Sequence, residues 1–371
     1  MQDYLWDGIK RDRMVWIGDM HPEVMTISNV FGYHAIVPKS LDFVRDHTPL
    51  PNWMNGISAY SMWWVIIQHD WYMFHGKLDY LQQQKTYLLP LLDLFMSKVD
   101  ADGKEDIHDK SFRFIDWPSS ENPQGVHAGL QALMVLTFEK AAVLCDVLNE
   151  TAKAKACRDM AVKMKKYIPD VNHSKQAASL LALAGIVPAI KANEEVIAVG
   201  GAKNFSAFFG YYMLQAQAKA GAHEAALNNI RNYWGGMLDM GATTFWEDFN
   251  LDEAKTAGRI DEIVPAGKKD FHRDCGAYCY IGLRRSLCHG WASGPTSWLT
   301  ENVLGIKVTT PGCKVITIEP HLGDLKFAEG SFPTPYGVLR VKHMKMANGQ
   351  IKTEVKGPKE IKIVRAREKA I

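Results

Sequence analysis

The chain has 371 residues, and its 47% apolar and 23% charged residues are the proportions of an ordinary folded globular protein. Its net charge of +2 and the lack of a basic run exclude the electrostatic surface of a nucleic-acid binder. The length predicts one large domain or two ordinary domains.

Aromatic residues are dense, with 11 Trp and 13 Tyr. Flat rings with one polar edge suit the C–H faces of sugars, although core packing explains any single tryptophan equally well. The density as a whole favours a carbohydrate ligand.

Targeting signals are missing from the sequence. No apolar stretch approaches the roughly 20 residues of a membrane span, and the first residues lack the basic start and apolar stretch of a signal peptide. We therefore expect no membrane span, and the compartment is unknown.

The first distinctive segment, residues 7–19, holds three carboxylates and three cations. Its acids are Asp7, Asp12 and Asp19, and Arg11 is one of its cations. Arginine keeps a neighbouring carboxylate ionised, whereas an aromatic wall raises the pKa of another. A surface ion-pair network explains the same pattern, so charge alone leaves both interpretations open.

Between about residue 55 and residue 300 the apolar spacing is helical. One buried face recurs from Leu130 to Leu148, and a second recurs from Ala154 to Ile168. Two further helical segments, at 205–220 and 224–233, are separated by a Gly-Ala break, which predicts a helical hairpin. We expect helices throughout residues 20–300, arranged as a bundle, a solenoid or a closed ring.

A second acidic segment, at 243–248, places Glu247 beside Trp246. Two carboxyl groups across a sugar, one protonated and one ionised, are what a glycosidase requires. The sequence has no Gly-rich phosphate loop, no His-Glu-x-x-His and no Gly-x-Ser-x-Gly, so it predicts no cofactor.

The six cysteines have no regular spacing and predict no disulfide framework. A group of cysteines and histidines near residues 272–289 lacks the paired Cys-x-x-Cys knuckles of structural zinc, so we predict no metal site there.

From about residue 306 the apolar period changes to two, which predicts antiparallel strands from about 313 to 366. The Asn348-Gly349 pair predicts a hairpin turn. The Thr-Thr-Pro-Gly break at 309–312 predicts the border between two domains.

Three ordered motifs resemble those of glycoside hydrolase family 78, the α-L-rhamnosidases. Residues 7–19 resemble the first, in which an Asp, an Arg-acid pair and Trp-x-Gly-Asp follow one another. Residues 241–247 resemble the second signature, and residues 288–294 resemble an Asn-His-x-x-x-x-Gly segment. The strands after Gly312 are similar to the family's C-terminal β domain, so the resemblance covers nearly the whole chain.

The resemblance implies a mainly α fold: an (α/α)6 catalytic toroid over residues 1–305 and a small antiparallel β-sandwich domain over residues 306–371. It also implies an inverting hydrolase that releases terminal α-L-rhamnose from glycosides or polysaccharides, with no cofactor. In such an enzyme the acid and the base stand about 6.5 to 9.5 Å apart to admit a water.

The resemblance also assigns roles to individual residues. Asp12 matches the general acid and Glu247 the general base, while Asp7 and Asp19 match acids that hold sugar hydroxyls and His289 matches a pocket histidine. We expect the remaining pocket residues to be Arg11, Trp246 and at least one of Trp71 and Trp117.

The acid position departs from the family, which commonly has Glu where this chain has Asp12. Aspartate is shorter by one methylene, and catalysis is sensitive to such displacements. Three interpretations stay open: Asp12 is the acid on a closer backbone, Glu23 replaces it, or the protein binds sugar without cleaving it. Retention of both motif arginines favours the first.

The first motif begins at residue 7, whereas family members carry an earlier ring helix and several β domains before it. We therefore expect a fragment or an abbreviated member, whose ring lacks its first helix. A partner segment or a homo-oligomer contact would cover the surface left exposed. The family is consistent with a periplasmic or secreted site.

Two other functions stay open: a non-catalytic or weakly active carbohydrate-binding relative, and another toroid enzyme such as an unsaturated uronyl hydrolase.

Overall fold

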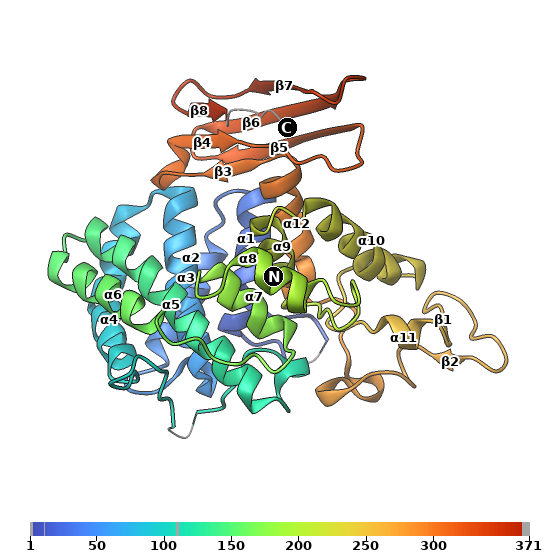
Figure 1. Cartoon of the computed structure of the whole chain (residues 1–371), viewed down its shortest axis with the longest axis horizontal. Coiled ribbons are helices and arrows are strands. Elements are labelled where there is room, and N and C mark those ends of the chain that lie inside the picture. Colours follow the sequence, from blue (N-terminus) through green and yellow to red (C-terminus); the bar gives the residue numbers. More distant parts are fainter. Residues whose placement is uncertain (1–2, 11, 109–110, 366–371) are drawn as a thin grey trace.

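The computed structural model describes residues 3–10, 12–108 and 111–365. A helical body fills residues 17–303, and two small sheets follow it (Figure 1). The helices within the described residues are α1 Ile17–Val30, α2 Ile36–Asp46, α3 Ser58–His75, α4 Leu78–Met96, α5 Pro123–Val147, α6 Thr151–Met164, α7 Lys175–Leu183, α8 Ala189–Ala192, α9 Gly210–Lys219, α10 His223–Asp239, α11 Leu251–Ala254 and α12 Gly294–Trp298.

Alternate helices form a closed inner ring. Each inner helix contacts the next in the order α1, α3, α5, α7, α9 and α12, and α12 in turn contacts α1. The intervening helices lie outside: α4 contacts α3 and α5, α8 contacts α7 and α9, and α2 contacts α1. This arrangement confirms the expected six-hairpin toroid.

The inner helix α5 illustrates how a helix of the ring begins and how it is buried. The Asn122 side chain caps it by accepting a hydrogen bond from the Gly125 N–H, and Pro123 occupies the first turn. The helix is long and apolar enough to cross a membrane, contrary to the sequence-based expectation, but 78% of its most apolar window is buried within the protein. It is therefore placed as a core helix of the ring.

The expectation of helices throughout residues 20–300 is wrong between α4 and α5, where the only helical element of the described residues is the 3₁₀ turn Trp117–Ser119, and again after α10. From residue 240 to residue 293 the chain contains α11, short 3₁₀ turns and a two-residue parallel pair, β1 Ala257–Gly258 with β2 Lys269–Asp270. Gly241, Gly267 and Gly276 have positive φ in this stretch, a conformation that interrupts regular helix. The first helix of the predicted hairpin also differs, because α9 begins at Gly210 and not at residue 205.

The C-terminal domain contains two three-stranded sheets, in the orders β3-β4-β8 and β5-β6-β7. Their strands are β3 Ile306–Val308, β4 Val315–Ile318, β5 Phe327–Thr334, β6 Gly337–Lys345, β7 Ile351–Lys356 and β8 Lys362–Arg365. The predicted hairpin at Asn348-Gly349 is confirmed, since β6 and β7 pair antiparallel around it.

Two details of this domain differ from the prediction. β4 and β8 pair in parallel, so the first sheet is mixed. β3 pairs with β4 across the 309–312 break, which makes that break a turn between strands and not a border between domains.

The sheets sit on the C-terminal ends of α1 and α3 (Figure 1). Phe74 at the end of α3 lies 6.0 Å from Phe332 of β5, ring centre to ring centre, and its carbonyl accepts a hydrogen bond from the Cys313 thiol at 3.2 Å. The opposite end of the ring, where α1 and α3 begin, holds the candidate site.

Candidate functional site

Side chains from three distant segments meet at this end of the ring. His289 Nε2 lies 3.0 Å from Asp19 Oδ2, and His289 Nδ1 lies 4.0 Å from Glu247 Oε1. Asp19 belongs to the first turn of α1, Glu247 to the loop after α10, and His289 directly precedes the 3₁₀ turn at 290–293. All three residues are at most 4% exposed, so they interact with little screening by water.

Asp7 joins this cluster through backbone pairing. Gly8 forms an antiparallel bridge with His289, and the Gly290 N–H donates to the Asp7 carbonyl at 3.0 Å. The Met14 N–H donates to Asp7 Oδ1, also at 3.0 Å, which holds the buried carboxyl group in a turn of the first motif.

Glu247 is fixed from two sides. The Ser286 N–H donates to Glu247 Oε2 at 2.6 Å, and the Glu247 N–H donates back to the Ser286 carbonyl at 2.9 Å. The Trp291 indole donates to the Glu247 carbonyl at 2.8 Å. The carboxyl group is thus pre-positioned, with Oε1 on the side of His289.

Tyr60 is a cluster member that the sequence analysis missed. Its hydroxyl donates to Asp19 Oδ1 at 3.5 Å, and its ring lies edge-on to Trp16 at 6.1 Å. A Cβ on Gly18 would come within 2.3 Å of the Tyr60 ring. The glycine in Trp-x-Gly-Asp is therefore required for this close approach. This glycine was the one feature of the sequence that could have indicated a bulky neighbour such as Tyr60.

The buried acids raise one another's pKa. Desolvation raises the pKa of Asp7 to about 6, with the charges of Asp19 and Asp12 adding to it. Desolvation likewise raises the pKa of Asp19, although the hydrogen bond to His289 opposes it. Burial lowers the pKa of His289, but the hydrogen bond and charge of Asp19, with the charges of Glu247 and Asp7, outweigh burial and leave it raised.

Asp12 differs from the other acids because its side chain is exposed. Its charge nevertheless acts on the buried Asp7 carboxyl, which places it beside the cluster. Arg11 lies outside the described residues.

Glu23, the alternative acid, lies one turn beyond Asp19 on α1 and is 5% exposed. Desolvation, followed by the charges of Asp19 and Asp7, raises its pKa well above the usual value. A Cβ on Gly290 would come within 1.8 Å of Glu23 Oε1, so the glycine after His289 makes room for this carboxyl group.

The predicted tryptophans occupy different places. Trp246, which precedes Glu247 in the chain, is fully buried, with its ring 5.3 Å from that of Phe271. Trp117 is partly buried and lies 5.1 Å from Phe114, whose ring in turn lies 6.4 Å from Tyr60.

Trp71 does not join the cluster, which corrects the sequence-based assignment. Its ring packs against His75 at 3.9 Å and Tyr33 at 5.3 Å. Tyr60 on the same helix is eleven residues earlier, and the helical rise of about 1.5 Å per residue separates the two by roughly 16 Å.

All six cysteines are free thiols. Within residues 3–10, 12–108 and 111–365, no group of three or more His, Cys, Asp or Glu side chains has the arrangement of a metal site. The chemistry that the cluster offers is acid–base chemistry by carboxyl groups and one histidine.

A helical toroid with a carboxyl cluster at one end defines the class of six-hairpin glycosidase domains. Comparison with family models narrows this class: residues 1–303 match the bacterial alpha-L-rhamnosidase 6 hairpin glycosidase domain. Residues 305–364 match the bacterial alpha-L-rhamnosidase C-terminal domain. The chain therefore belongs to the α-L-rhamnosidases of glycoside hydrolase family 78, as its motifs led us to expect.

The individual relatives have low sequence identity to this chain. An alpha-L-rhamnosidase of Alteromonas sp. (strain LOR) is 25% identical over 91% of this chain and 39% of its own length. Among solved structures, a family 78 rhamnosidase of Bacillus sp. GL1 is similar with a TM-score of 0.78 and 21% identity, over 99% of this chain and 40% of that one.

A Streptomyces avermitilis alpha-L-rhamnosidase complexed with L-rhamnose has a TM-score of 0.71 and 16% identity, over 97% of this chain and 35% of that one. At these identities the solved structures show a shared fold. The chain spans about two-fifths of the length of these relatives.

The raised pKa of Asp7 predicts a pH-dependent stability. The folded pKa of about 6 exceeds the value of about 3.9 in an unfolded chain, so the folded state binds the proton more tightly. Its stabilising contribution is complete below about pH 4 and is lost as the pH rises through about 6. Between pH 4 and pH 7 we expect the free energy of unfolding of the wild type to fall relative to that of Asp7→Asn.

Urea denaturation at several pH values measures this difference. Asp79→Asn, at an exposed aspartate of α4, is the control and should keep the wild-type pH profile. A constant difference between wild type and Asp7→Asn from pH 4 to pH 7 would show that folding does not raise the pKa of Asp7.

Proposed function

We propose that this chain is the catalytic part of a glycoside hydrolase that releases terminal α-L-rhamnose with inversion at the anomeric carbon. The observation that carries the proposal is the buried Glu247 carboxyl, held by the Ser286 N–H and facing His289, with the exposed Asp12 beside the same cluster. The family match and the L-rhamnose in the Streptomyces avermitilis relative support the choice of sugar.

Glu247 acts as the general base. The hydrogen bond from the Ser286 N–H to Oε2 fixes the orientation of the carboxyl group. Oε1, on the side of His289, accepts a proton from the water that attacks the anomeric carbon. Because the group is buried and pre-positioned, little reorganisation is needed as charge develops.

Asp12 acts as the general acid and protonates the departing oxygen. Its exposed side chain lies where a leaving group of variable size can extend into solvent. Asp7 lies close enough to Asp12 for the charges of the two groups to interact, which places Asp12 at the edge of the sugar-binding cluster. This interpretation retains Asp12 over Glu23, which is buried against Gly290.

The remaining cluster residues bind the sugar. Asp7 and Asp19 accept hydrogen bonds from its hydroxyls, and His289 Nδ1, which has no hydrogen-bond partner among the described residues, reaches a further hydroxyl or the water. Trp117 offers an aromatic face, and the fully buried Trp246 packs against Phe271 in the loop that carries Glu247. We also retain Arg11 as a sugar-pocket residue.

A screen of aryl glycosides tests the substrate, with the α-L-rhamnoside first and an uronate-ended oligosaccharide beside it. Hydrolysis of the rhamnoside is the expected result. Cleavage of the uronate alone would identify a different toroid enzyme, and rhamnose binding without any turnover would identify a carbohydrate-binding relative.

Removing the base should abolish most of the turnover. We expect Glu247→Ala to lower kcat on aryl α-L-rhamnosides by about 10² to 10⁴-fold, even when the leaving group is good. The affinity for rhamnose should change much less, because the other cluster residues hold the sugar. Calorimetric titration with rhamnose measures the affinity. Glu247→Gln, which keeps the acceptor for the Ser286 N–H, controls for folding, and near-normal activity of both variants would contradict the assignment.

Removing the acid should change how the rate depends on the leaving group. Asp12→Asn should be severely impaired on substrates with poor leaving groups, yet approach the parent on aryl rhamnosides whose phenol is strongly acidic, since such a group departs with little protonation. A plot of kcat/KM against leaving-group pKa measures this dependence. If Glu23→Gln shows that dependence and Asp12→Asn does not, Glu23 is the acid.

A further inference from the structure

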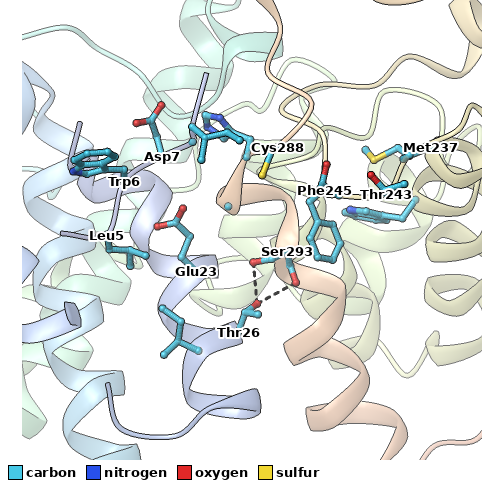
Figure 2. A pocket seen from close by; sticks show the side chains of 18 of the residues that line it. Leu5, Trp6, Asp7, Glu23, Thr26, Met237, Thr243, Phe245, Cys288 and Ser293 are labelled. Atoms are coloured by element: carbon cyan, nitrogen blue, oxygen red, sulfur yellow. Dashed lines mark hydrogen bonds between the residues drawn. The ribbon is translucent and has the colours of Figure 1, made fainter. Parts of the chain in front are cut away.

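Two cavities of similar size lie in the helical body. The first, of about 980 Å³, is lined by Asp7 and Glu23 (Figure 2) and belongs to the site already described. The second has a volume of about 910 Å³ and lies near the beginnings of α5, α7 and α9, where Asn122, Lys175 and Asn204 line it. We call it the polar groove. The described residues of the carboxyl cluster do not line it, so it is a separate space.

The polar groove adjoins the proposed sugar pocket. Ser119, two residues after Trp117, lines the groove, and so does Asp248, directly after Glu247. The segments that carry the aromatic residue and the base of the pocket therefore continue into the wall of the groove.

Asp116 connects the polar groove with the cluster. Its Oδ2 accepts a hydrogen bond at 3.2 Å from the side-chain amide of Gln176, which lines the groove. Burial, followed by the charges of Asp19 and Asp116, raises the pKa of Tyr60, so Asp116 also lies close to the cluster. One buried residue thus spans the distance between the two, and a sugar attached to the rhamnose can reach the groove.

Lys175 is a buried cation in the wall of the polar groove. The residue is 5% exposed, its Nζ donates to the Gly201 carbonyl at 2.8 Å, and Nζ lies 5.5 Å from the centre of the Phe205 ring. Burial lowers the pKa of Lys175 to about 8, and no acid opposes this effect. An ammonium group has three donors, and a buried charge is costly unless it is paired. One carbonyl leaves most of this requirement unmet.

Acids also line the polar groove, but they are carried by other elements than Lys175. They lie on α10, on α11 and on the loop between them: Asp239, Asp248, Asp252 and Glu253. Asp252 accepts a hydrogen bond from Lys255 at 2.6 Å, and Asp248 lies 3.8 Å from the buried Arg285 guanidinium. In the described part of the chain none of them forms an ion pair with Lys175, so its positive charge is available to a bound anion.

Amide side chains are the other common feature of the polar groove. Five asparagines line it: Asn122, Asn172, Asn204, Asn232 and Asn250. An amide both donates and accepts hydrogen bonds, as a sugar hydroxyl does. Amides for hydroxyls and an ammonium for a carboxylate are together the groups that recognise an acidic sugar.

We propose that the polar groove binds the sugar to which the rhamnose is attached, and that this sugar is a uronic acid whose carboxylate pairs with Lys175 Nζ. The proposal rests on the rhamnosidase function proposed above and names the class of its substrate. The carboxylate supplies the negative charge that the buried ammonium lacks, and little water is present to screen the pair. The asparagine amides bind the hydroxyls of the same ring.

Two disaccharides that differ in one group test this proposal on the whole chain. The first is α-L-rhamnose linked to a uronic acid, and the second is the same disaccharide with the carboxyl group reduced to a primary alcohol. The measured quantity is the ratio of kcat/KM for the acidic disaccharide to kcat/KM for the neutral one, at about pH 7, where the carboxylate and Lys175 are both charged. We expect a ratio of at least about ten, because a hydrogen bond between charged groups contributes at least that factor.

Lys175→Met removes the ammonium group but keeps an unbranched side chain, and it should lower this ratio to about one. Any loss of activity that the two disaccharides share cancels in the ratio. Lys219→Met is the matched control and should keep the wild-type ratio. Lys219 also donates to a carbonyl at 2.8 Å, that of Leu183, but it ends α9 and does not line the polar groove.

The possible failures are distinguishable. A wild-type ratio near one, with normal hydrolysis of aryl α-L-rhamnosides, would overturn this proposal and leave the proposed function standing. This measurement needs no variant, so it decides the matter even if Lys175→Met does not fold. An unchanged ratio in Lys175→Met, or an equal fall in Lys219→Met, would overturn the role of Lys175. Absence of hydrolysis of every rhamnoside would contradict the proposed function itself, and this proposal with it.

Discussion

Closure of the helical ring is the constraint on which the site depends. The return of α12 to α1 brings residues 7–19 against residues 286–294, and His289 thereby meets Asp19 from 270 positions away in the sequence. Backbone pairing of Gly8 with His289 and of Gly290 with the Asp7 carbonyl fixes this meeting to within a hydrogen bond. A ring that failed to close would still contain helices, but it would have no site.

The same closure sets the electrostatics. Asp7, Asp19 and Glu247 act on one histidine, and Glu23 lies near Asp19 and Asp7, in a region from which water is largely excluded. Raised pKa values of Asp7, Asp19 and Glu23 favour the neutral forms of these acids, and the raised pKa of His289 favours the protonated imidazole. The exposed Asp12 stands apart from this arrangement, as expected of a group that must meet leaving groups of different sizes.

The sequence predicted those parts of the fold that depend on local pattern. Helical spacing and the change to a period of two identified the helical body and the sheet domain, and Asn348-Gly349 identified a turn. The closed ring was expected only from the family resemblance. The parallel pairing of β4 with β8 could not be predicted, because it joins strands far apart in the chain and leaves no local mark. The irregular path of residues 240–293 is held by contacts such as that of Arg285 with the Phe271 ring, which again are tertiary.

The residues of the site likewise divide into those that the sequence predicted and those that it could not predict. Asp7, Asp19, Glu247 and His289 lie in recognisable motifs and meet in the structure, whereas Ser286 contributes a backbone N–H that no side-chain pattern reveals. Trp71 was wrongly chosen because α3 is rich in aromatic residues along its whole length, and composition does not tell which end faces the cluster.

The most direct test of the account is the configuration of the sugar when it is first released. Proton NMR during early hydrolysis of an aryl α-L-rhamnoside by this chain distinguishes the two anomers before they equilibrate. A base that activates water on the face opposite the leaving group predicts β-L-rhamnose as the first product. First release of α-L-rhamnose would contradict the roles given to Glu247 and Asp12.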